Sequence, residues 1–433
     1  MRISFKDNFV IWFNVAVAFI LIIGYQYLGE ALKYIAVPYV LYLVWSKDVR
    51  YFPALIVHII PGSTISLLIL TGCLFLTIYH FNHVKFHKIR WLIIISLLPL
   101  PIFYYMTLMR IFTLDKGFID IVVPLGLYLG LFPFYYGVLI SDQITIKIWR
   151  AIYLVLFFTS LLFFMPFINY YIRLFFFAFP LYLSVSFLIF NKRFRSFLKN
   201  YEIFIAVLIF IMTLFGGYML TFTLLGSGFV GLFLAISYYK FRANIKLFTK
   251  PYRLILIFAI LTALIIKSSS NYNFNVSDTY NPSMILSSNV LDYIQYKALG
   301  DRGHIWEGSW EYLKNKQMFW PPYELPKYNL EIKNTKTILT SIPVHNLMLE
   351  LFRNYGFVIG GLVFFVYIVK ISLSGRLLLI RNRDIYETLF TSTTLGVGFI
   401  GALTGQYPLI GTFSFLLLGV AGLLYGISKN IVT

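Results

Sequence analysis

Apolar runs long enough to cross a lipid bilayer recur along the whole chain, and this feature constrains its fold more than any other. A hydrocarbon core of roughly 30 Å requires about 20 mainly apolar helical residues. Because backbone polar groups in lipid must be paired within a segment, the runs predict an all-α polytopic membrane protein with about 12–14 transmembrane helices. The predicted spans are approximately 9–28, 31–45, 62–81, 91–107, 121–140, 151–169, 174–190, 203–220, 222–239, 254–266, 355–373, 389–406 and 409–427.

Composition agrees with this class, since 59% of the residues are hydrophobic and only 12% are charged. Soluble domains carry about twice that share of charge. The first apolar run has no small-residue cleavage site after it, so we interpret it as a span and not a signal peptide. The topology of residues 1–61 stays open, because 51–60 is too short to cross alone and is either re-entrant or part of a tilted helix.

The net charge of +19 is concentrated in alternate loops, at 83–90, 191–202, 240–253 and 374–383. Cytoplasmic loops of membrane proteins carry an excess of Lys and Arg, so all four loops are predicted to be cytoplasmic. The basicity therefore indicates topology and gives no support to nucleic-acid binding. Alternation from the third span onward places the C-terminus inside and the long segment 267–353 outside.

This segment divides the chain into three predicted parts: an N-terminal bundle (1–266), a large periplasmic loop with short helices (267–353) and C-terminal transmembrane helices (354–433). The loop holds eight of the 17 acidic residues, whereas the spans hold almost no charge apart from Lys370. Long membrane loops are usually functional. The lone Cys73, inside an apolar run, is incompatible with a disulfide framework or a cysteine metal cluster.

Two helices are expected in the loop. Asp301 is a candidate N-cap for a helix that ends near Asn315, with Trp306, Trp310 and Leu313 along one face. The two tryptophans are typical of the membrane–water interface. A second helix is expected to start near Pro343 and run into the next span, with Gly356 as a candidate break.

The polar residues of these helices are candidates for chemistry. His345 precedes the second helix, and an interfacial histidine can take a proton from a hydroxyl near neutral pH. Asn346, Glu350 and Arg353 would form one polar stripe at the water boundary if they follow helical spacing. Arg302, at a helix N-terminus, offers a planar fork for phosphate oxygens. Headgroup contact by His345 and a salt bridge of Arg302 remain the structural alternatives.

Two spacings resemble motifs of the O-antigen ligase/polymerase superfamily of bacterial envelope glycan assembly. Arg302 is followed four residues later by Trp306, and His345-Asn346 is followed by Gly356, eleven residues after the histidine. The similarity covers 300–370 locally and the whole chain in topology.

The resemblance implies a glycosyltransferase of GT-C-like architecture in the bacterial inner membrane, which needs no metal or other cofactor. Its donor would be an undecaprenyl-diphosphate-linked oligosaccharide held within the membrane lipid. His345 would act as the base on the acceptor hydroxyl, while Arg302, Arg173 and Arg353 would hold the diphosphate. Asn346, Glu350 and Trp306 would support them.

Within that superfamily two reactions are open. Ligases, which transfer the finished glycan to lipid A–core, commonly carry an arginine after a Thr-x-Ser/Thr run, and the corresponding stretch 223–229 has none. We therefore favour a repeat-unit polymerase, for which a chain-length regulator protein is an expected partner. A lipid-linked glycan flippase is a further alternative, disfavoured by the scarcity of charge in the spans.

Overall fold

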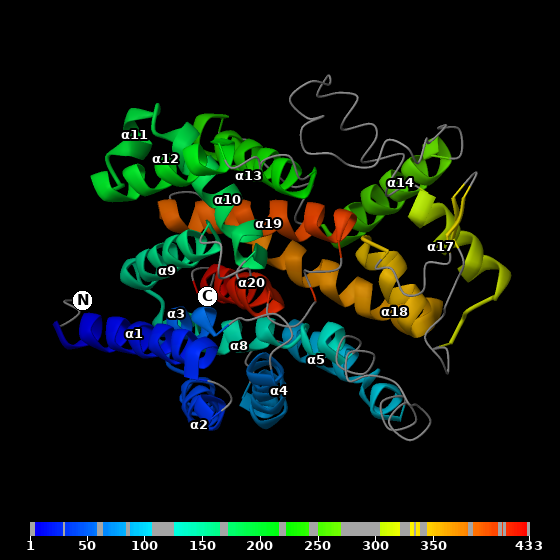
Figure 1. The fold of residues 1–433 in the computed structure, drawn as a ribbon, viewed down its shortest axis with the longest axis horizontal. Helices are drawn as coiled ribbons and strands as arrows, with labels where there is room; N and C mark the ends of the chain where they lie inside the picture. The colour runs from blue at the N-terminus through cyan, green and yellow to red at the C-terminus, as the bar shows by residue number, and fades with distance from the viewer. Residues whose placement is uncertain are drawn as a thin grey trace.

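A computed structural model describes residues 5–28, 31–58, 64–83, 87–105, 125–164, 172–215, 222–241, 250–269, 304–320, 330–332, 335–337, 344–379, 384–405, 409 and 413–430. Most helices run along the long axis of the molecule (Figure 1). α17 and the start of α18 lie at one end of this axis, and the start of α1 and α11 lie at the other (Figure 1).

A helix lies at each predicted span. The helices are α1 (Phe5–Leu28), α2 (Ala31–Trp45), α3 (Phe52–Val57), α4 (Thr64–Tyr79), α5 (His87–Leu97), α8 (Pro133–Ile140), α9 (Ile146–Phe164), α10 (Ile172–Leu188), α11 (Lys192–Arg195), α12 (Asn200–Phe215), α13 (Phe222–Phe241), α14 (Pro251–Ser269), α17 (His304–Asn315), α18 (Leu347–Ser374), α19 (Ile385–Thr404) and α20 (Phe413–Asn430). The 3-10 turn η7 (Gly375–Leu379) follows α18.

Five helical segments within the described ranges are long and apolar enough to cross a membrane: Asp7–Gly24, His87–Tyr105, Leu125–Gln143, Pro251–Ser268 and Leu347–Leu379. Several other apolar helices are shorter. The chain is therefore a helical membrane protein.

One small element departs from the predicted all-α class. Strands β1 (Leu330–Ile332) and β2 (Thr335–Thr337) form an antiparallel hairpin, with Leu330 opposite Thr337. The β-branched side chains of Ile332, Thr335 and Thr337 suit a strand better than a helix. The hairpin lies beside α17 at the same end of the molecule (Figure 1).

Glycines bring the central helices into backbone contact. Gly137 of α8 faces the carbonyl oxygen of Gly419 on α20, and a Cβ on Gly396 of α19 would lie 2.7 Å from the carbonyl oxygen of Ser227 on α13. In lipid, helix association relies on such close packing of small residues. These contacts fix α19 and α20 at the centre of the bundle.

Polar contacts gather the ends of the first helices on one side. The Arg50 guanidinium lies 2.9 Å from the Asp7 carboxylate, and Lys47 Nζ lies 3.0 Å from His80 Nε2. The start of α1 and the ends of α2 and α4 therefore share one end of the bundle. The stretch 51–60, left open by the sequence, contains the separate short helix α3, whose residues are all buried.

The predicted span 121–140 is two helical pieces and not one continuous helix. Residues 125–129 are helical, and α8 starts at Pro133, which cannot continue the hydrogen-bond ladder. Lys370 of α18 is fully buried, and its Nζ donates a hydrogen bond to the Leu131 carbonyl oxygen, 2.8 Å away. Lys370 thus satisfies a carbonyl beside the break.

Candidate functional site

The site is built around a break in α18. Gly356 has φ +72°, and a Cβ there would lie 2.6 Å from the Trp320 carbonyl carbon. Only glycine suits this backbone and this approach. The predicted break is therefore confirmed.

The two pieces of α18 on either side of Gly356 pack against each other. A Cβ on Gly360 would lie 2.5 Å from the Leu351 carbonyl oxygen. The longer piece, 357–374, spans about 27 Å at 1.5 Å per residue, which matches a hydrocarbon core. The shorter piece, 347–355, is held at one end of that span.

The segment after α17 caps the longer piece. The backbone N–H groups of Phe357 and Val358 donate to the carbonyl oxygens of Met318 and Phe319, at 2.8 and 3.1 Å. The first N–H groups of a helix have no partner within it, so these contacts replace the missing ones. The loop is thereby fastened to the membrane-spanning piece.

Val344 is held through both of its backbone polar groups. Its carbonyl oxygen accepts a hydrogen bond from Trp306 Nε1 at 2.9 Å, and its N–H donates to Glu350 Oε2 at 3.0 Å. Trp306 is buried and does not lie at the water–lipid interface as predicted. Its indole N–H needs a partner when buried, and Val344 supplies one.

The buried face of α17 also differs from the predicted one. Ser309 and Leu313 are buried beside Trp306, whereas Trp310 is 40% exposed and packs edge-on against Phe357. Trp306 and Leu313 already fill the buried apolar stripe of this short helix. Trp310 therefore lies at the edge of that stripe.

His345 follows Val344 in the left-handed region, with φ +54°. This conformation is uncommon for residues other than glycine, although His adopts it more readily than most. It costs on the order of 1–3 kcal/mol, so the surroundings must enforce it. The bonds of Val344 on one side and the capping bond of Asn346 on the other do so.

Asn346 is the N-cap of α18, and its side chain joins three helices. Oδ1 accepts from the Leu349 N–H at 3.2 Å, while Nδ2 donates to Thr262 Oγ1 of α14 and to the Leu403 carbonyl of α19. Asn346 precedes the helix and turns inward, so it does not belong to a stripe with Glu350 and Arg353 as predicted.

Glu350 and Arg353 form a buried ion pair, with Arg353 Nη2 2.5 Å from Glu350 Oε1. The amide of Asn354 donates to the same carboxylate oxygen at 2.9 Å. Buried charges are tolerated only when they are paired and hydrogen-bonded, as they are here. The predicted stripe at the water boundary is thus an internal network. The guanidinium N–H groups of Arg353 would have to be shared between Glu350 and any bound phosphate.

Three aromatic rings that sequence reasoning missed pack beside the break. Phe103 stacks on Tyr128 with ring centroids 4.1 Å apart, and it contacts Tyr355, the residue before Gly356, at 4.4 Å. The Tyr355-Gly356 pair was the only hint of this cluster in the sequence. The rings attach the site to helices far upstream in the chain.

Five predicted site residues are thus brought together: Trp306, His345, Asn346, Glu350 and Arg353. Arg302 lies outside the described residues. Arg173 is the second residue of α10, and its side chain is likewise outside them. Among the residues that the structure describes, no group of three His, Cys, Asp or Glu side chains is placed to hold a metal ion.

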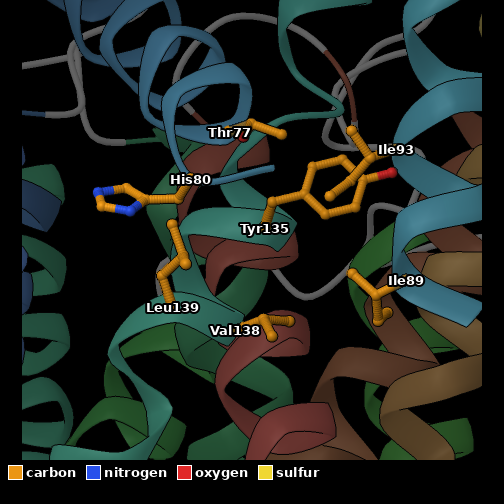
Figure 2. A pocket seen from close by; sticks show the side chains of 7 residues that line it. All are labelled: Thr77, His80, Ile89, Ile93, Tyr135, Val138 and Leu139. Carbon is orange, nitrogen blue, oxygen red and sulfur yellow. The ribbon is translucent and has the colours of Figure 1, made fainter. Parts of the chain in front are cut away.

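A small pocket, with room for about one water molecule, lies elsewhere, between α4, α5 and α8 (Figure 2). It is lined by Thr77, His80, Ile89, Ile93, Tyr135, Val138 and Leu139, and Figure 2 shows the Tyr135 ring across its middle. None of the predicted site residues belongs to this lining.

In comparisons with known proteins, no family model, no curated protein and no solved structure matches this chain.

Proposed function

We propose that this protein is a glycan polymerase of the bacterial inner membrane. It would transfer a growing undecaprenyl-diphosphate-linked glycan onto a new lipid-linked repeat unit at the periplasmic face. The observation that best supports the proposal is the enforced backbone of His345, which stands between the tethered Val344 and the capping Asn346 at the start of a span.

In the proposed reaction, His345 takes the proton of an acceptor sugar hydroxyl as its oxygen attacks the donor's anomeric carbon. The bond between that carbon and the diphosphate oxygen breaks, and a glycosidic bond forms. Undecaprenyl diphosphate leaves with the bonding electron pair. Fixed cations stabilise this developing charge, and Arg302 is the first candidate, with Arg173 and Arg353 as further ones.

Supporting roles follow from the contacts. Trp306 and Glu350 hold Val344, and Asn346 fixes the other side of His345. These groups act on the position of His345 and need not touch the glycan. A ligase would use the same chemistry with lipid A–core as acceptor, so the acceptor has to be decided by experiment.

The gene should be deleted in its own host and the envelope glycan separated on a gel. Loss of a polymerase is expected to leave core bearing a single repeat unit. Core with no repeat unit would instead indicate a ligase or a flippase. Chains of normal length in the deletion strain would contradict the proposal.

A further inference from the structure

Three cations gather where the first turn of α5, the turn after α18 and the last turn of α20 meet. They are Lys88 in the first turn of α5, Arg376 in η7 and Lys429 in the last turn of α20. The Arg376 guanidinium lies over the Tyr425 ring, 5.8 Å from its centroid, and Tyr425 is one helical turn before Lys429. Lys88 is exposed, and Arg376 and Lys429 are half-buried.

These cations act on one another. The pKa of Lys429 is lowered, first by burial and then by the positive charges of Arg376 and Lys88. The fold therefore holds like charges together where their surroundings disfavour the charge of Lys429. An anion bound between them would relieve this repulsion.

The small pocket of Figure 2 adjoins this cluster. Ile89 and Ile93 line it from α5, immediately after Lys88, and Val138 lines it from α8. A Cβ on Gly426 of α20 would lie 3.5 Å from the Val138 carbonyl oxygen, so the last turn of α20 adjoins the same wall. An apolar pocket and a group of cations thus meet at the ends of α5, α8 and α20.

Exposed aromatic side chains mark the level of this cluster relative to lipid. Trp45, Tyr79 and Trp91 are each more than half exposed, and they lie at or near the ends of α2, α4 and α5. Trp and Tyr are enriched where the hydrocarbon core meets the headgroups. The cations therefore lie at headgroup level.

We propose that Lys88, Arg376 and Lys429 bind the phosphate of an anionic phospholipid where the ends of α5, η7 and α20 meet the lipid headgroups. Basic pockets between transmembrane helices on the cytoplasmic side suit such headgroups. The four basic loops indicate that this end faces the cytoplasm. The proposal depends on that orientation and not on glycan transfer.

The test uses the full chain purified in detergent and offered phosphatidylglycerol or phosphatidylcholine with identical acyl chains. Lipid retained on the protein is counted by native mass spectrometry. Wild-type protein is expected to retain phosphatidylglycerol several-fold over phosphatidylcholine. The double variant Lys88→Ala/Lys429→Ala should bring this ratio close to one.

The matched control is Arg195→Ala/Lys250→Ala, which removes the same charge from exposed positions on other predicted cytoplasmic segments. It should keep the wild-type ratio, and so should Arg376→Lys, which keeps the charge. An equal loss in the control would overturn the proposal, because general charge attraction would then explain the preference. Equal retention of both lipids by wild-type protein would overturn it as well.

A second measurement covers the case in which the double variant does not fold. In wild-type protein, 1 M salt shortens the screening length to about 3 Å. The preference for phosphatidylglycerol should then fall sharply, and a preference that survives 1 M salt would contradict the cation site. His345→Asn should keep the lipid preference, so failure here is distinguishable from failure of the proposed enzyme activity.

Discussion

The indole Nε1–H of Trp306 donates a hydrogen bond to the carbonyl oxygen of Val344, 2.9 Å away, across 38 positions of sequence. This bond joins α17 to the residue that precedes His345. The tryptophan of the Arg302–Trp306 spacing is therefore buried in the protein and holds the residue before His345. Trp306 and the His345-Asn346 pair, which the sequence presents separately, are therefore joined through Val344.

Trp306→Phe keeps most of the buried ring but removes the donor. It should destabilise the protein by about 1–3 kcal/mol, because the Val344 carbonyl is left without this partner. Thermal unfolding in detergent measures the loss, and glycan chain length in complemented cells should fall. Trp310→Phe is the control, since Trp310 is 40% exposed and should change stability little. Equal effects of the two substitutions would contradict the role of the Trp306 bond.

Glu350→Ala removes the carboxylate that pairs with the buried Arg353 guanidinium and also releases Val344. Breaking a buried pair from one side costs about 3–5 kcal/mol, because one charge is left uncompensated. The double variant Glu350→Ala/Arg353→Met should be more stable than Glu350→Ala alone. Melting temperatures of the wild type, the two single variants and the double variant form a double-mutant cycle, which measures the coupling between Glu350 and Arg353. Strictly additive losses would show that the pair is not coupled.

Gly356→Ala should be among the most destabilising substitutions in α18. The new Cβ would require a left-handed alanine and would lie 2.6 Å from Trp320 backbone atoms. At Gly361, by comparison, a Cβ would only reach ordinary contact with Phe352 at 3.7 Å. Gly361→Ala should therefore be neutral or stabilising by up to about 1 kcal/mol. A comparison of both proteins by thermal unfolding checks the break, and similar melting temperatures would contradict it.

Asp384, the N-cap of α19, should make the free energy of unfolding depend on pH. Its carboxylate accepts a hydrogen bond from the Tyr386 N–H at 2.8 Å, yet its pKa is raised, because burial outweighs that bond and the nearby Arg150. Since the pKa of Asp384 is higher in the folded than in the unfolded protein, protonation of Asp384 favours the folded state. This contribution to the free energy of unfolding is present at low pH. It is lost as the pH rises through the folded pKa.

Asp384→Asn keeps a capping oxygen and removes the titration, so it should flatten the pH dependence of unfolding in the acidic range. Asp384→Ala should lose the cap and about 1 kcal/mol at every pH. Unfolding measured across the acidic range separates the two variants. A wild-type curve that rises with pH through this range, and keeps that rise in Asp384→Asn, would contradict the assignment.

Hydropathy located the helices because each apolar run must satisfy its own backbone in lipid, a local requirement that sequence displays directly. The break at Gly356 and the end of α17 at Asn315 were also predictable, since Gly and turn residues act locally. Pro133 likewise marks the interruption before α8 in the sequence, although the span 121–140 was predicted as one continuous helix.

Contacts between distant segments were beyond this reasoning. Glu202 was assigned to a basic cytoplasmic loop, but it is fully buried, with Arg150 Nε 3.2 Å from its carboxylate and the Tyr386 hydroxyl donating to it. The inward turn of Asn346 depends likewise on α14 and α19. Such pairings follow from tertiary packing, which one sequence does not display.

Whether His345 supplies the base is tested most directly by His345→Asn. Asparagine tolerates the left-handed backbone, so the variant should fold with a melting temperature close to wild type while it lacks the imidazole. His87→Asn, at an exposed position on α5, is the matched control. In deletion cells, His345→Asn is predicted to leave core bearing a single repeat unit, whereas His87→Asn restores long chains. Long chains of normal length from a folded His345→Asn protein would contradict the account.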